Sequence, residues 1–77
     1  MHSNDRAQLR AAIAVRFGNR VEVTKMVHGS SGLVLAHVRL PELSEADSLN
    51  LKEWVQTELR AFNAEQSDGL VVAPVYS

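Results

Sequence analysis

The sequence contains no cysteine, two prolines and one tryptophan in 77 residues. The lack of cysteine excludes disulfides and thiol chemistry. No apolar run reaches the roughly 18 to 20 residues that a membrane-spanning helix needs, and no signal-peptide pattern is present. We therefore expect a soluble, cytoplasmic protein with no membrane partner.

Neither sign of charge dominates. Eight lysine and arginine residues are balanced by nine aspartate and glutamate residues, for a formal net charge of −1. Such a chain has no general electrostatic attraction to nucleic acid or anionic membrane. Arg6, Arg10, Arg16 and Arg20 give the first part of the chain a modest basic bias, but few aromatic residues accompany them. We therefore expect no nucleic-acid partner.

The length predicts a single domain over residues 1–77. A chain this short buries only about 60 to 65% of its unfolded surface, so its core alone gives little stability. Oligomerisation is a common additional source of stability in such small domains.

Two alternating segments, Val21–Val27 and Val34–Leu40, flank the sequence His28-Gly29-Ser30-Ser31-Gly32 and predict a β-hairpin. Glycine at both ends of the turn supplies the positive φ that such a loop often needs. A register centred on Ser30 and Ser31 places these pairs opposite each other: Val27 and Val34, Lys25 and Ala36, Val23 and Val38, Met26 and Leu35, Thr24 and His37, Glu22 and Arg39, His28 and Leu33.

A first helix is predicted from a cap at Ser3 or Asn4 to about Phe17, with Gly18-Asn19 as its stop. Helical spacing predicts that one stripe packs against the rest of the domain; it contains Leu9, Ala12, Ile13 and Phe17.

A second helix follows Pro41. Ser44 and Asp47 resemble a capping box, although a start at Ser48 is also compatible with the sequence. The helix should end near Ala64 or Glu65. Its apolar residues recur at helical spacing: Leu51, Trp54, Val55, Leu59 and Phe62.

After a predicted turn at residues 67–69, Leu70–Tyr76 reads as a final strand, and Pro74 places this strand at an edge or bends it. The element order is therefore α-β-β-α-β. A right-handed crossover makes the last strand parallel to the second. The prediction is an α+β fold, a three-stranded mixed sheet with two helices on one face.

That arrangement leaves the other sheet face uncovered, while both faces of the last strand are apolar. Contiguous exposed apolar surface commonly marks an interface, so we expect a homodimer or a protein partner; a monomer with an apolar surface is the alternative. The candidate interface residues are Met26, Leu33, Leu35, Leu70, Val72 and Tyr76.

His28 and His37 are the candidate metal ligands. The derived register puts them on one face but several residues apart, so they would not share an ion within one subunit. Glu22, Asp47 or a second subunit could complete such a site, whereas a solvated or hydrogen-bonded histidine is the commoner arrangement. No cofactor motif, paired carboxylates or catalytic triad is evident, so we expect no cofactor and no enzyme activity.

Other residues allow two interpretations each. Arg16 and Glu58 fall within the apolar stripes of their helices, either as side chains that extend to solvent or as an ion pair. Trp54 suits a core position or the margin of an interface. Tyr76 either ties down the last strand or reaches across an interface.

The segment Leu35-Ala36-His37-Val38-Arg39-Leu40 lies in the second predicted strand of this α-β-β-α-β order. The order resembles that of the cytosolic C-terminal domain of cation diffusion facilitators, which is similar in length. The resemblance implies dimerisation and draws attention to the strand residue His37. It is a resemblance of layout, and fold alone does not imply function.

The sequence thus predicts a noncatalytic protein-interaction module, a homodimer that binds through its sheet face or an edge strand. The alternative is a small ligand- or metal-sensing domain that uses His28, His37 and nearby carboxylates.

Overall fold

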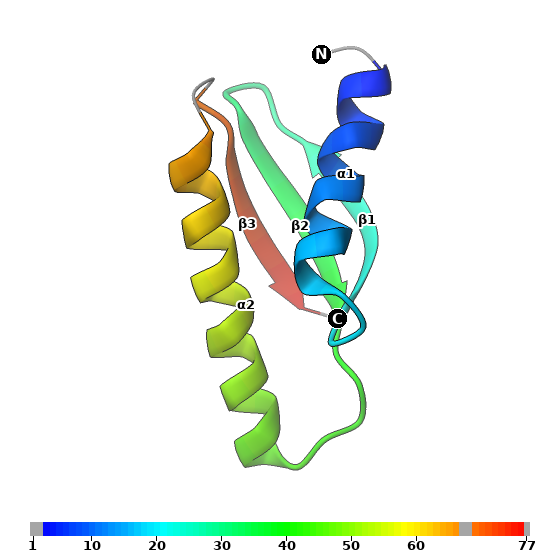
Figure 1. Ribbon diagram of the computed structural model, residues 1–77, viewed down its shortest axis with the longest axis vertical. Helices are drawn as coiled ribbons and strands as arrows, with labels where there is room; N and C mark the ends of the chain where they lie inside the picture. Colours follow the sequence, from blue (N-terminus) through cyan, green and yellow to red (C-terminus); the bar gives the residue numbers. More distant parts are fainter. Residues whose placement is uncertain (1–2, 67–68, 77) are drawn as a thin grey trace.

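The computed structural model describes the backbone of residues 3–66 and 69–76, and the side chains of these residues from Arg6 onward. Within this part the elements follow the predicted α-β-β-α-β order (Figure 1). They are α1 (Ser3–Phe17), β1 (Glu22–His28), β2 (Leu33–Arg39), α2 (Glu45–Glu65) and β3 (Val71–Tyr76).

The strands form one sheet in the order β1-β2-β3. β1 and β2 are antiparallel, and β3 is parallel to β2, as the sequence predicted. Both helices lie on the same side of this sheet, with α1 next to β1 and α2 next to β3 (Figure 1). The predicted α+β fold with two helices on one face is confirmed.

The helix ends follow the local chemistry of the sequence. Gly18 has φ of 62°, a conformation that suits glycine, and its N–H donates to the carbonyl of Ala14 at 2.9 Å. Ser44 caps α2, because its hydroxyl accepts the Asp47 N–H at 3.2 Å. The start at Ser44 is therefore the one adopted. Of the predicted turn at residues 67–69, residues 67 and 68 lie outside the described residues, and Gly69 has φ of 79°.

The hairpin turn occupies the predicted residues, but only one of its two glycines has a positive φ. Gly32 has φ of 83°, and an added Cβ would lie 3.2 Å from the carbonyl oxygen of Gly69. Gly29 instead donates its N–H to the Leu33 carbonyl at 2.7 Å, which closes the turn. A side chain at Gly32 would be strained by its positive φ, and an added Cβ at Gly29 would lie 3.1 Å from the Leu33 carbonyl oxygen.

The predicted register holds at one end of the hairpin and is wrong at the other. Glu22 pairs with Arg39, and Val23 pairs with Val38, as expected. A β-bulge at Thr24 then shifts the remaining partners by one residue. The observed pairs beyond the bulge are Lys25 with His37, Met26 with Ala36, Val27 with Leu35, and His28 with Val34.

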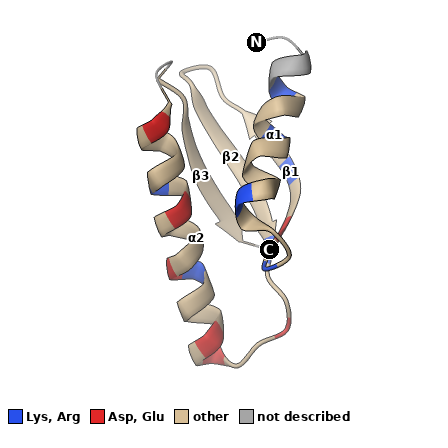
Figure 2. Cartoon of the chain, viewed as in Figure 1, with Lys and Arg blue, Asp and Glu red and all other residues tan. Residues whose placement is uncertain are grey.

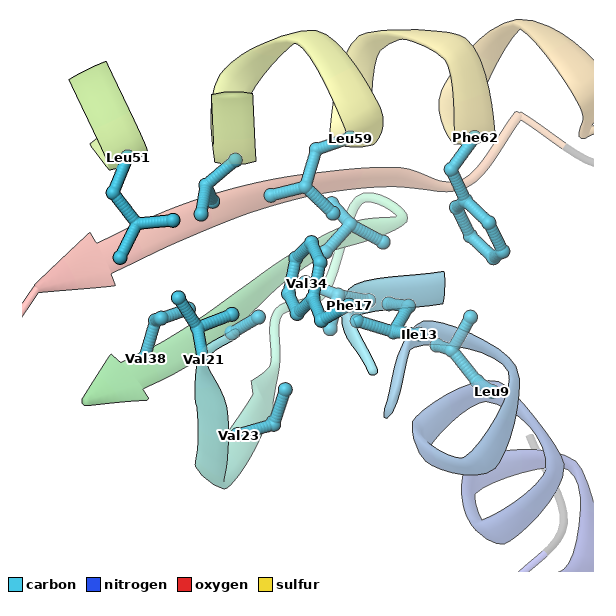
Figure 3. Packing of buried hydrophobic residues seen from close by; sticks show 13 residues of the cluster. Leu9, Ile13, Phe17, Val21, Val23, Val34, Val38, Leu51, Leu59 and Phe62 are labelled. Atoms are coloured by element: carbon cyan, nitrogen blue, oxygen red, sulfur yellow. The ribbon is translucent and has the colours of Figure 1, made fainter. Parts of the chain in front are cut away.

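The core lies between the sheet and the two helices. Side chains from all five elements point into one shared space, and the ring of Phe17 lies near its centre (Figure 3). The prediction for α1 is corrected at Ala12, which is exposed. The buried residues are Leu9, Ile13, Phe17, Val21, Val23, Val34, Ala36, Val38, Leu51, Val55, Leu59, Phe62 and Val72.

Candidate functional site

The sheet face opposite the helices is apolar, and no other element of the described chain covers it. We call this surface the open face. Three of its side chains are substantially exposed, namely Val27 at 43%, Leu33 at 42% and Val71 at 49%. The strand pairing adds three partly buried neighbours, which complete the open face: Leu35, Ala73 and Val75.

The structure corrects the composition of the predicted surface. Met26 pairs with the buried Ala36 and packs against the core, so it faces the helices. Val72 is buried, and Leu70 and Tyr76 also pack against the core. Of the six predicted interface residues, Leu33 and Leu35 remain on the open face.

These errors have two physical causes. The bulge at Thr24 reverses the faces of the residues that follow it in β1, which brings Val27 out and Met26 in. In β3 the strict alternation of side chains was evident, but both sets are apolar. The sequence alone therefore could not decide which set faces the helices.

Charged side chains lie at one margin of the open face. Glu22 and Arg39 are cross-strand partners and provide opposite charges, while Lys25 is the partner of His37. All three charged residues are exposed. Two positive side chains and one negative side chain leave a small net charge, so the open face does not strongly repel a second copy of itself.

The outer edge of β3 is closed by a side chain of α2. Asn63 donates from Nδ2 to the Val72 carbonyl at 3.0 Å and accepts the Val72 N–H on Oδ1 at 2.8 Å. The amide thus satisfies both backbone groups of Val72, as a neighbouring strand would.

Pro74 removes a further donor from the same edge. The Val71 N–H donates to the Gly32 carbonyl at 3.0 Å, on the side of β2. Since backbone groups alternate sides along a strand, Val72, Pro74 and Tyr76 present theirs to the outer edge. Pro74 has no N–H, so a further strand would find few donors there.

The edge at β1 is interrupted by the bulge. Arg10 of α1 donates from one guanidinium nitrogen to the Val23 carbonyl at 3.1 Å and to the Thr24 carbonyl at 3.3 Å. The Thr24 hydroxyl also donates to the His37 carbonyl at 3.2 Å. A bulge with bound carbonyls is a poor template for a further strand.

The two candidate metal ligands lie on opposite faces of the sheet. His28 pairs with the buried Val34 on the helix side, whereas His37 pairs with Lys25 on the open face. The bulge separates them, contrary to the predicted register. Among the described residues no group of three histidine or carboxylate side chains could hold a metal ion.

Arg16 connects the two helices. Its Nε donates to Glu58 Oε2 at 3.0 Å, and one terminal nitrogen donates to Glu65 Oε2 at 2.6 Å. The ion-pair interpretation of Arg16 and Glu58 is therefore confirmed. Hydrogen bonds to Glu65 and then to Glu58 raise the pKa of Arg16.

Trp54 and Tyr76 belong to the helix side. The rings of Trp54 and Phe17 have centroids 5.8 Å apart, and the Arg20 guanidinium lies 4.4 Å from the centroid of the Trp54 ring. The Tyr76 hydroxyl donates to the Lys52 carbonyl at 3.2 Å and so ties β3 to α2. Partial burial raises the pKa of Tyr76.

The fold and this surface define a class, a small α+β domain with one uncovered, apolar sheet face. No family model matches the chain, and neither a curated protein nor a solved structure shows detectable similarity to it. In the part of the chain that the structure describes, neither helix has the length and apolar character needed to cross a membrane.

Proposed function

We propose that this chain is a noncatalytic protein-interaction domain that forms a homodimer through the open face. The observation that carries the proposal is the exposure of Val27, Leu33 and Val71 on one contiguous, helix-free surface. Exposed apolar surface of this kind is costly in water and is commonly buried at an interface.

The partner is a second copy of this chain, packed face to face. Pairing through an edge is disfavoured, because Asn63 and Pro74 block β3 and Arg10 occupies carbonyls of β1. Two sheets can instead stack about 10 Å apart and interdigitate their side chains. The small net charge at the margin of the open face, from Glu22, Lys25 and Arg39, allows this approach.

Light scattering across a concentration series tests the proposal. We expect a dimer for the unmodified chain, and monomers for Leu33→Asp and Val71→Asp, because a carboxylate would be desolvated in the interface. Both residues are partly exposed, so the monomeric variants should keep their circular dichroism spectrum. Val72→Asp is unsuitable, since Val72 is buried and its substitution would test folding instead.

Val15→Asp is the matched control, because Val15 is an apolar residue on α1 with 81% exposure. This variant should dimerise as the unmodified chain does. A monomer at every concentration would refute the proposal, and so would a dimer that survives both open-face substitutions.

A further inference from the structure

A groove of about 540 Å³ lies where α1, the connection to β1 and the end of β2 meet. We propose that this groove binds a small molecule through a phosphate group. Glu22 and Arg39, at the margin of the open face, line this groove, whereas Val27, Leu33 and Val71 do not, so substitutions at those three residues test the dimer separately.

The charges that line the groove favour a dianion. Arg10 comes from α1, Arg20 from the following connection and Arg39 from the end of β2. Glu22 is the only carboxylate among the lining residues, which leaves an excess of two positive charges. A phosphate monoester carries a charge of roughly −1.5 to −2 at neutral pH.

None of the three groove arginines has a carboxylate partner among the described side chains. Among the side chains described, from residues 6–66 and 69–76, both ion pairs belong to Arg16 and none to the groove arginines. A guanidinium presents a planar fork of donors that matches phosphate oxygens. An anion in the groove would provide the countercharge that these arginines lack.

Two of the arginines are held in place by contacts that leave donors free. Arg10 uses a single terminal nitrogen for the Val23 and Thr24 carbonyls. Arg20 lies over the face of Trp54, an arrangement that keeps the edge of the guanidinium accessible. Such positioning reduces the entropy that ligand binding would otherwise cost.

Two carbonyl groups at the C-terminal end of α1 have backbone partners and do not need these arginines. The Ala14 carbonyl accepts the Gly18 N–H at 2.9 Å, and the Phe17 carbonyl accepts the Arg20 N–H at 3.3 Å. These carbonyls at the helix end therefore already have backbone partners.

The remaining wall of the groove suits an organic group attached to the phosphate. Its volume lies within the range of small-molecule sites, roughly 300 to 1,000 Å³. The ligand class is therefore a phosphomonoester with a small apolar substituent. The apolar lining residues are Ala14, Val21, Val23, Leu40 and Pro41.

Phenyl phosphate is the probe for this proposal, with binding followed by amide chemical shifts and by the fluorescence of Trp54. Trp54 is the only tryptophan in the sequence and contacts Arg20, so its fluorescence reports on the groove through Arg20. We expect saturable binding of phenyl phosphate, weaker binding of inorganic phosphate and no binding of phenol.

Arg39→Gln should weaken phenyl phosphate binding about tenfold or more, as expected for the loss of a charge-assisted hydrogen bond. Arg39→Lys keeps the charge but removes the fork, and should weaken binding less. Arg60→Gln is the control, because Arg60 is an exposed residue of α2 outside this groove and its loss changes the net charge equally.

Two results would overturn the proposal. One is the absence of saturation, and the other is an equal loss of affinity in Arg39→Gln and Arg60→Gln, which would indicate nonspecific charge attraction. Flotation with phosphatidylcholine vesicles that contain phosphatidic acid distinguishes the source of the phosphate. A small-molecule site predicts no flotation, whereas flotation that depends on Arg39 would assign the groove to a lipid headgroup.

Discussion

The side-chain amide of Asn63 pairs with both backbone polar groups of Val72, at 3.0 Å to the carbonyl and 2.8 Å from the N–H. The contact joins the last turn of α2 to the outer edge of β3. It also occupies the groups that an additional strand would need. One side chain thereby fixes the position of β3 and limits edge-to-edge association.

Asn63→Ala should lower the free energy of unfolding by about 1 to 3 kcal/mol, because it leaves two partly buried backbone groups without a partner. Asn63→Asp should also destabilise, since a carboxylate oxygen would face the Val72 carbonyl. Urea unfolding measures both effects. The exposed Asn50 lies on the same helix, and Asn50→Ala should leave stability nearly unchanged. Equal effects at the two positions would contradict this role of Asn63.

Met26→Asp and Val27→Asp test the register that the bulge produces. Met26 packs against the core, so its substitution should destabilise the fold by about 1 to 3 kcal/mol through burial of a charge next to apolar groups. Val27→Asp should instead preserve the fold and weaken the proposed dimer. Thermal unfolding and light scattering separate the two results. The reverse outcome would restore the regular register.

Ile13→Ala should lower the free energy of unfolding by about 2 to 5 kcal/mol, because Ile13 is fully buried and its truncation leaves a cavity. Val15→Ala, two residues away on the exposed side of α1, should change stability by less than about 0.5 kcal/mol. Urea unfolding of both variants makes the comparison. Similar losses would mean that α1 is rotated from the described orientation.

The Arg16–Glu58 contact should show a small, salt-sensitive coupling in a double-mutant cycle with Arg16→Gln and Glu58→Gln. The two side chains are 26% and 29% exposed, so solvent screens their attraction. The cycle is measured by urea unfolding at low and high ionic strength. A coupling that does not change with salt would assign the interaction to packing instead. This contact joins helices of different charge: Figure 2 shows basic residues on the described part of α1 and residues of both signs on α2.

Tyr76 should make the fold sensitive to alkaline pH. Desolvation raises the pKa of Tyr76 in the folded state, so the unfolded chain releases this proton first. Its contribution to stability is complete below pH of about 10, the value for an unfolded tyrosine, and declines as the pH rises through the folded-state pKa. Tyr76→Phe should remove this decline in urea unfolding series between pH 8 and 11. An unchanged alkaline profile in Tyr76→Phe would contradict the assignment.

The candidate site was only partly predictable from the sequence. The hairpin was evident from two alternating segments, but Arg10, which binds the Val23 and Thr24 carbonyls at the bulge, lies 13 residues before Val23. The closure of the β3 edge likewise depends on a contact between α2 and β3. Neither contact leaves a local pattern in the sequence.

The sequence by itself determined the elements and their order, because these depend on local features. Helical spacing, the Ser44 cap, the Gly18 stop and the glycine turn all act within a few residues. Only the tertiary structure decided which apolar face of β3 is buried, where β1 bulges and which arginines share a groove. Those properties arise from contacts between elements distant in the sequence, where a side chain's position depends on packing as well as on its own propensity.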